Sequence, residues 1–305
     1  MKNRGLDGQP HIRAFCYFCI LMLTKRHCIL SLFLLLTASA IGQSLLNDPV
    51  VPDSLLQDRK TAYHYYKAHY WDECHLNDSS LVKIPAFKQR LLAFFEQVVP
   101  PLPDSINMEI DKLVASIDNK AVRDEVLWTL LEKYLHPEYM THDQVFIHLS
   151  DRYFSQLPIS GLTEDNRRLI MAKADQWRRL ILFSTAPNLQ LFDKKGRTIN
   201  MQDIESEYLV LFFYDHDCDI CKEESHDLEA LCQVHPEVKV LAIDTNYPFK
   251  PYKNGFIHVS IIGPGDDPME TYDVETTPLL YILDRNKRII AKKLMASQIE
   301  QLLFP

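Results

Sequence analysis

The sequence predicts an all-helical domain followed by an α/β domain with a mixed central sheet flanked by helices. Over residues 53–183, apolar side chains recur three and four positions apart, which is the spacing of one helix face. From residue 186 onward, short continuous apolar runs alternate with helical stretches. With 305 residues and 47% hydrophobic side chains, the chain is long enough for two domains of ordinary size.

The first 40 residues have the pattern of a secretory signal peptide. Lys25 and Arg26 precede the apolar run 28–36, and small residues follow at 38–40. The run is shorter than the roughly 20 residues that a membrane-spanning helix needs. A buried core helix and a retained membrane anchor are the alternatives. A second apolar stretch further upstream does not belong to such a signal, so we expect translation to start at Met22.

Charge argues against nucleic acid as a partner. Removing residues 1–40 takes away five basic residues and one acidic residue, which changes the net charge from −8 to −12. Binding to phosphate groups requires clustered positive charge, which such a chain lacks. No later stretch is typical of a membrane-surface helix, so we expect no stable membrane anchor once the signal is cleaved.

The helical domain is expected to contain five or six helices, with prolines at the joins. Its clearest helix follows Pro103, with Asp104 as the expected N-cap. The apolar residues of this helix share one face: Ile106, Ile110, Leu113, Val114 and Ile117. Similar faces predict helices around residues 122–131, 146–153 and 170–181.

The α/β domain is predicted from five apolar runs and three helical stretches. The runs 208–214 and 238–244 are continuous, as expected for strands that are buried on both faces. The expected strands are Leu189–Phe192, Tyr208–Tyr214, Val238–Asp244, Leu279–Asp284 and Arg288–Leu294, of which the last two form a hairpin. The expected helices are Lys222–Val234, Pro268–Tyr272 and Ala296–Leu303.

One cysteine pair has a spacing with chemical meaning, namely Cys218–Asp219–Ile220–Cys221. It lies where a buried strand is followed by a helix. Free amide N–H groups and the positive end of the helix dipole stabilise a thiolate there, which lowers the pKa of the first cysteine. We therefore expect Cys218 to be the exposed nucleophile and Cys221 to resolve the mixed disulfide.

A second motif is Thr276–Thr277–Pro278, directly before a predicted strand. Proline is a poor residue at that point because it removes a hydrogen-bond donor from the sheet. The position therefore predicts a cis-proline. Its turn would pack beside the cysteine pair and present the Thr277 backbone to an extended substrate. An ordinary trans-proline at the strand entrance is the alternative.

Residues 186–305 resemble the periplasmic TlpA/ResA-like thiol-disulfide oxidoreductases of the thioredoxin superfamily. The shared features are an Ala-Pro-x-Leu opening, a strand that ends in Phe-Phe-Tyr, CxxC followed by Lys222, and Thr277–Pro278. The resemblance implies a thioredoxin-like fold and export to the periplasm of a Gram-negative-type bacterium. In that family a glutamate at the position of Glu224 lies near the active site and helps to manage its protons. A solvated helix carboxylate is the alternative for this residue.

The resemblance also implies the reaction and its partners. The expected activity is thiol-disulfide exchange with protein substrates through the Cys218–Cys221 disulfide, with no other cofactor. Electrons would come from an upstream membrane or periplasmic donor. Four scattered cysteines outside the signal segment do not form a disulfide scaffold, so structural disulfides are not expected.

Three residues of the CxxC segment are expected to tune its redox properties. The family commonly has tryptophan and proline where this chain has Asp217 and Ile220, and Asp219 adds a further carboxylate. Negative charges beside Cys218 disfavour its thiolate, whereas the helix terminus favours it. We therefore expect a modestly activated thiol and a protein that acts as a reductase rather than as a strong oxidant. Cytoplasmic thioredoxins also carry a buried aspartate where this chain has Phe212.

Residues 53–183 resemble the helical region that precedes such modules in some exported bacterial proteins. The matching stretches are 70–72 and 143–149, and the resemblance implies no function for this region. The expected division of the chain is thus a signal peptide and upstream segment over 1–43, a helical domain over 44–183, and the thioredoxin-like domain over 184–305.

Several alternatives compete with this interpretation. The main one is a non-catalytic binding or assembly module that uses the thioredoxin fold as a scaffold. Thiol peroxidase is a weaker alternative, because Asp215 stands where peroxiredoxins place threonine or serine. Haem attachment would require histidine in place of Lys222. No metal is expected, because three nearby candidate ligands on one helix point to different faces: His226, Cys232 and His235.

Overall fold

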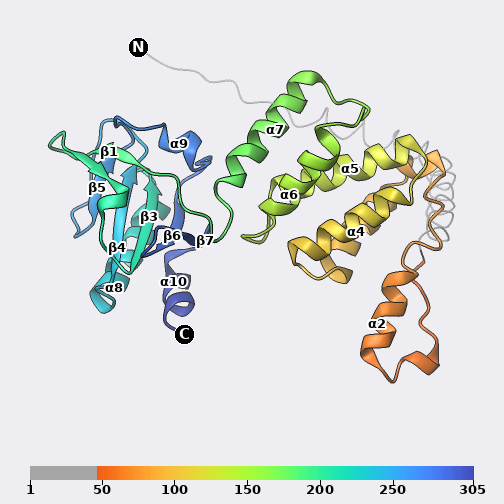
Figure 1. The fold of residues 1–305 in the computed structure, drawn as a ribbon. Helices are drawn as coiled ribbons and strands as arrows, with labels where there is room; N and C mark the ends of the chain where they lie inside the picture. Colours follow the sequence, from red (N-terminus) through yellow and green to blue (C-terminus); the bar gives the residue numbers. More distant parts are fainter. Residues whose placement is uncertain (1–46) are drawn as a thin grey trace, which may run out of the picture. The chain divides into compact units, whose positions relative to one another are not determined.

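The computed structural model describes residues 47–305, so the signal-peptide prediction lies outside the described part (Figure 1). The chain forms two compact units that divide between Phe94 and Phe95. No helix in the described residues is long and apolar enough to cross a membrane.

The first unit is helical over its described part. Its elements are the 3-10 helices η1 (Asp53–Leu55) and η2 (Ser79–Lys83) and the α-helices α2 (Arg59–Ala68) and α3 (Pro85–Ala93). Arg90 of α3 is buried, and its guanidinium lies 4.1 Å from the centre of the Tyr70 ring. The same guanidinium donates to the carbonyl oxygen of Asn47 at 3.1 Å. One cation thus holds the start of this unit against α3.

The second unit begins with helices. They are the π-helical turns η3 (Phe94–Val98) and η4 (Ser150–Phe154) and the α-helices α4 (Pro103–Ala115), α5 (Lys120–Leu135), α6 (Asp143–Leu149) and α7 (Glu164–Arg178). The N-cap of α4 is Leu102, so the assignment of this role to Asp104 was wrong. Pro103 occupies the first helical position, where a missing N–H costs nothing. Asp104 lies in the first turn, where an acidic side chain interacts favourably with the positive end of the helix dipole.

A five-stranded mixed sheet forms the core of the remaining residues, which confirms the predicted fold class. Its strands lie in the order β5-β4-β3-β6-β7. Strands β3, β4 and β5 run parallel, and β6 is antiparallel to both β3 and β7. The bounds are β3 (Tyr208–Tyr214), β4 (Val238–Asp244), β5 (Ile257–Ser260), β6 (Leu279–Asp284) and β7 (Ile289–Lys292).

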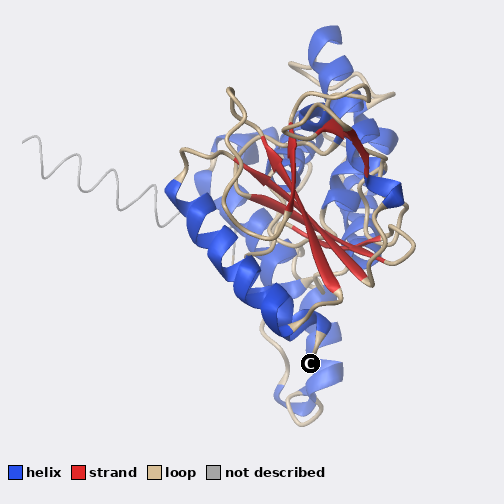
Figure 2. Cartoon of the chain, turned by 90° about the vertical axis from the view of Figure 1, so that its left-hand side faces the viewer, coloured by secondary structure: helices blue, strands red, loops and turns tan. Residues whose placement is uncertain are grey.

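The other elements of this domain are a small two-stranded hairpin and several helices. The helices flank the central sheet (Figure 2). The hairpin is β1 (Gln190–Phe192) and β2 (Thr198–Asn200), followed by the 3-10 helix η5 (Met201–Asp203). The helices are α8 (Asp219–Val234), α9 (Pro268–Thr271) and α10 (Ala296–Leu303). The predicted bounds of β3, β4, β6 and α10 agree with the structure, whereas β2 and β5 were not predicted.

Strand β3 lies at the centre of the sheet and is buried on both faces, as its continuous apolar run predicts. Because side chains alternate along a strand, Leu211 and Phe213 belong to one core cluster, and Phe212 belongs to the other. The second cluster also contains Leu228 of α8 and Ile299 of α10. These two helices therefore cover the Phe212 face of the sheet.

A buried carboxylate joins α8 to α10. Glu224 of α8 has a relative exposure of 4%, and its Oε2 accepts a hydrogen bond from the backbone N–H of Ala296 at 2.6 Å. Ala296 is the first residue of α10, so the contact satisfies one of the N–H groups that have no partner within that helix. Burial raises the pKa of Glu224, although the hydrogen bond from Ala296 opposes this shift.

Two substitutions of Glu224 are expected to distinguish the effect of its charge on stability from the effect of its hydrogen bond. Because its pKa is raised in the folded state, the proton-linked part of its contribution to stability is present at low pH and is lost as the pH rises above 4.5 through the raised pKa, whereas the hydrogen bond from Ala296 remains. Glu224→Gln keeps an acceptor for Ala296 and should remove this pH dependence. Glu224→Ala should lower the free energy of unfolding by about 1–2 kcal/mol at pH 7.

Urea denaturation of the three proteins between pH 4 and pH 8 tests this expectation. Glu223→Gln, at an exposed position of the same helix, is the matched control and should behave like the wild type. Equal destabilisation by glutamine and alanine at position 224 would contradict the proposed role of the hydrogen bond.

Candidate active site

Cys218 is the N-cap residue of α8, directly after the loop that follows β3. Its Sγ accepts a hydrogen bond from the backbone N–H of Cys221 at 3.2 Å. An N–H group that points at the sulfur from a helix N-terminus stabilises a thiolate. The sequence predicted the strand-to-helix position of the pair, and the structure adds that the first sulfur itself caps the helix.

Asp215 shapes the loop between β3 and α8. Its Oδ1 accepts hydrogen bonds from the backbone N–H of Asp217 at 2.8 Å and from the side chain of Asn246 at 2.9 Å. Its carbonyl oxygen accepts from the backbone N–H of Cys218 at 3.1 Å. The hydrogen bond from Asp217 is the main reason why the pKa of Asp215 is lowered. An ionised aspartate therefore fixes the backbone immediately before the nucleophile.

The two cysteines of the pair have different environments. Cys221 is completely buried, whereas Cys218 is half-buried. Burial is the main reason why the pKa of Cys221 is raised to about 12; the neighbouring Cys218 contributes to the rise, and the Asp215 backbone and the Thr277 side chain oppose it. Cys221 is therefore a thiol at neutral pH. Both cysteines are in the free thiol form.

The turn around Pro278 lies against this pair. The peptide bond between Thr277 and Pro278 is cis, which is the isomer that the sequence analysis expects. Leu279, directly after Pro278, pairs with Phe213 near the end of β3, and the Thr277 side chain lowers the pKa of Cys221, so the turn lies close to the cysteine pair. The fold thus brings together two motifs that are far apart in the sequence.

Glu224 is buried rather than solvated. The alternative of a solvated carboxylate was wrong, because the side chain is buried against α10. The hydrogen bond that the structure describes for it goes to Ala296 rather than to a cysteine. A role in managing the protons of the cysteine pair therefore stays a prediction.

The three expected tuning residues are all exposed. Asp217 and Asp219 have side-chain exposures of 71% and 92%, and Ile220 is exposed as well. Asp219 forms an ion pair with Lys222 at 2.7 Å, and this hydrogen bond lowers the pKa of Asp219. Solvent and Lys222 therefore screen the negative charge beside Cys218.

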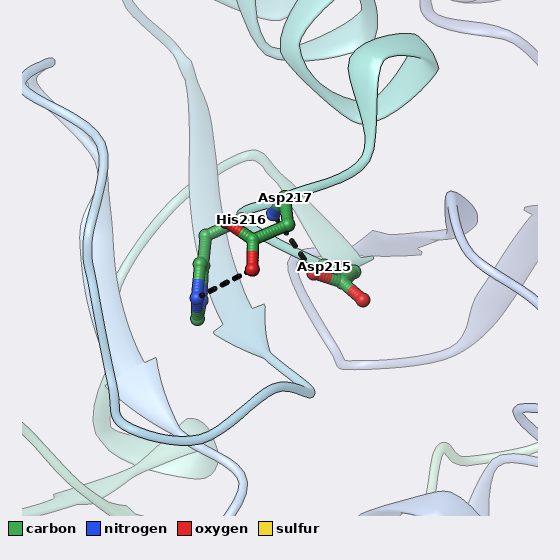
Figure 3. Close-up of side chains that lie close together, drawn as sticks. All are labelled: Asp215, His216 and Asp217. Carbon is green, nitrogen blue, oxygen red and sulfur yellow. Dashed lines mark hydrogen bonds and ion pairs between the residues drawn. The ribbon is translucent and has the colours of Figure 1, made fainter. Parts of the chain in front are cut away.

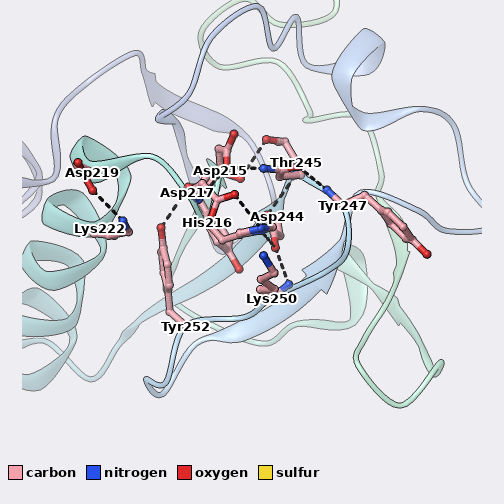
Figure 4. Close-up of polar contacts among 12 residues, drawn as sticks. Asp215, His216, Asp217, Asp219, Lys222, Asp244, Thr245, Tyr247, Lys250 and Tyr252 are labelled. Carbon is pink, nitrogen blue, oxygen red and sulfur yellow. Dashed lines mark hydrogen bonds and ion pairs between the residues drawn. The ribbon is translucent and has the colours of Figure 1, made fainter. Parts of the chain in front are cut away.

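Sequence reasoning missed a buried pair beside this loop, His216 and Asp244. The Nδ1 of His216 lies 2.8 Å and 3.0 Å from the two carboxylate oxygens of Asp244 (Figure 4). Asp244 is the last residue of β4 and is paired in register with Tyr214, the last residue of β3. The backbone N–H groups of Asn246 and Lys250 also donate to its carboxylate. An acidic residue that ends a buried apolar run was the available signal.

Tyr252 is a second residue that the sequence did not indicate. Its hydroxyl donates to the carbonyl oxygen of Asp215 at 3.2 Å, and its ring lies 4.6 Å from that of Tyr214. Burial raises its pKa, and the proximity of Cys218 and Cys221 contributes to the shift. Tyr252 therefore supports the loop from the side of β4.

Two family matches cover different parts of the chain, one over mainly helical residues and the other over the α/β domain. Residues 36–168 match a domain of unknown function, DUF5106, and residues 183–292 match the AhpC/TSA family. No curated protein matches the sequence.

Similar solved structures carry thioredoxin-like descriptions. A thioredoxin-like protein from Bacteroides caccae has a TM-score of 0.64 and 18% identity, over 85% of this chain and 97% of that one. A domain of a possible thiol-disulfide isomerase from Cytophaga hutchinsonii has 29% identity and a TM-score of 0.37, over 40% of this chain and 90% of that one. A thiol:disulfide interchange protein from a Bacteroides species has 19% identity and a TM-score of 0.36, over 41% of this chain and 91% of that one.

The family matches agree with the geometry of the α/β domain. A mixed sheet carries a CxxC pair at the start of a helix, with a cis-proline turn beside it. The chain therefore joins a DUF5106 domain to a thioredoxin-like domain of the AhpC/TSA family.

Proposed function

We propose that this chain is an exported thiol-disulfide oxidoreductase that reduces disulfides in protein substrates. The observation that carries the proposal is the asymmetry of the cysteine pair. Cys218 caps α8 and is accessible, whereas Cys221 is buried and protonated beside it. A nucleophile and a resolving thiol need these two environments.

The reaction follows from this arrangement. The Cys218 thiolate attacks one sulfur of a substrate disulfide, which forms a mixed disulfide and releases the other sulfur as a thiolate that takes up a proton. Cys221 then loses its proton and attacks the Cys218 sulfur. The second substrate thiol leaves, and the Cys218–Cys221 disulfide remains. Two electrons have passed to the substrate, and a dithiol donor must return them.

Other parts of the chain supply the setting for this reaction. The backbone of Thr277, beside the cis-proline, is the proposed docking edge for an extended substrate segment. The N-terminal signal segment supports export to the periplasm, and an upstream membrane or periplasmic dithiol is the proposed electron donor. No nucleic acid partner and no further cofactor are proposed.

Substitution of the nucleophile is expected to abolish turnover. Cys218→Ser should reduce the rate of insulin disulfide reduction with a dithiol donor by about 10³-fold or more, because a serine hydroxyl does not ionise at neutral pH. Cys232→Ser is the matched control on the same helix. Burial raises the pKa of Cys232 to about 11, so this thiol should not contribute to turnover.

Two outcomes would contradict the proposal. Equal absence of turnover in the wild type and in Cys218→Ser would favour the non-catalytic binding module. Consumption of hydrogen peroxide that depends on Cys218, without reduction of insulin, would favour the thiol peroxidase. If the proposal holds, Cys221→Ser should trap substrates as mixed disulfides that the double variant Cys218→Ser/Cys221→Ser does not form.

The direction of electron flow has its own test. We propose that the pair is a reductant, because two carboxylates, Asp217 and Asp219, flank Cys218 in the sequence. Equilibration with glutathione should give a reduction potential closer to about −270 mV, typical of thioredoxin, than to about −120 mV, typical of a strong periplasmic oxidant. A value at the oxidant end would contradict the reductase assignment.

A further inference from the structure

Three consecutive residues between β3 and α8 present a set of metal-ligand atoms. Asp215, His216 and Asp217 each offer one such atom, and these atoms all lie within 4.8 Å of one another (Figure 3). A group of acidic residues in a loop would not by itself indicate an ion. The central histidine gives this group its significance.

His216 is buried, with a relative exposure of 7%, and its Nε2 has no hydrogen-bond partner. Buried polar atoms in folded proteins are nearly always hydrogen-bonded, so such an atom requires an explanation. The Nε2 atom points towards the carboxylate of Asp217 and lies 3.6 Å from its Oδ2, too far for a hydrogen bond (Figure 3).

The other ring nitrogen explains why Nε2 is available. Both carboxylate oxygens of Asp244 already accept hydrogen bonds from backbone N–H groups, so the Nδ1 atom of His216, 2.8 Å from this carboxylate, is the donor in their contact. In the neutral imidazole this leaves a lone pair on Nε2. Histidines that bind metals are typically oriented in this way, with the second nitrogen donating to a carboxylate behind the ring. Asp244 is completely buried and is held by two backbone N–H groups, so it is well placed to fix the ring.

The spacing suits a small ion. Zinc binds histidine nitrogen and carboxylate oxygen at about 2.0–2.2 Å. A separation of 3.6 Å between Nε2 and the Asp217 oxygen therefore leaves room for an ion between them, at an angle of about 120°. Asp217 is exposed and can rotate towards the ion. Asp215 offers one carboxylate oxygen as the third possible ligand.

We propose that Asp215, His216 and Asp217 bind a divalent transition-metal ion, with zinc as the preferred ion and Asp244 as the positioning residue. Imidazole together with carboxylate suits zinc, nickel and copper, whereas magnesium and calcium prefer oxygen ligands alone. Three protein ligands leave one coordination position of the ion open. One of these ligands, Asp217, directly precedes Cys218 in the sequence. The site departs from the sequence-based expectation of no metal, which considered only histidines and a cysteine of α8.

This inference does not rest on the proposed reductase activity, because neither cysteine is a ligand. The test uses the untagged full-length chain with Cys218→Ser/Cys221→Ser. This double variant removes the two thiols of the CxxC pair as competing metal ligands. Zinc binding is measured by calorimetry, and cobalt binding by its visible absorption. We expect one equivalent of each ion to bind.

Variants in this background assign the ligands. His216→Ala should abolish binding, and Asp217→Asn should weaken it at least tenfold. Asp244→Asn should weaken it by about 10–100-fold, which is the usual effect of losing the residue that orients a ligand. His226→Ala, at an exposed position of α8, is the matched control and should leave the affinity unchanged.

The absence of stoichiometric zinc binding would overturn the proposal, as would binding that survives both His216→Ala and Asp217→Asn. The second variant changes an exposed side chain, so it remains informative if the first one does not fold. Magnesium binding as tight as zinc binding would also contradict a site built around an imidazole.

Discussion

The burial of β3 on both faces is the constraint on which the rest of the α/β domain depends. The strand pairs with β4 on one side and with β6 on the other, so its position is fixed from four directions. The loop after its last residue is stabilised by hydrogen bonds to Asp215, and it ends at Cys218, the N-cap of α8. The geometry of the proposed nucleophile is thus a consequence of core packing rather than of the loop alone.

Polar groups around the cysteine pair are divided between the surface and the interior. Asp217 and Asp219 lie in solvent, where their effect on Cys218 is screened. A buried pair of ionisable side chains is formed instead by His216 and Asp244. Phe212 occupies the position where cytoplasmic thioredoxins carry a buried aspartate, and it packs in the apolar core. The buried ionisable pair that lies closest to this loop in the described structure is therefore on the side of β4.

The combination of helical residues with a thioredoxin-like domain has a counterpart in one similar solved structure. The similarity to the Bacteroides caccae protein extends over 85% of this chain, which is more than the α/β domain alone provides. The DUF5106 match covers most of the helical residues. The combination of the two folds is therefore not peculiar to this sequence.

By itself, the sequence determined the change from helical to α/β structure along the chain, the strands β3, β4 and β6, and the position of Cys218 and Cys221 at the start of a helix. These features depend on local patterns, namely continuous apolar runs and a fixed spacing of two cysteines. The sequence did not predict the division into two compact units between Phe94 and Phe95. Only the tertiary structure decided that Glu224 caps α10 and that His216 meets Asp244. Both contacts depend on the register of parallel strands and on the packing of two helices, which join residues that are distant in the sequence and leave no local pattern.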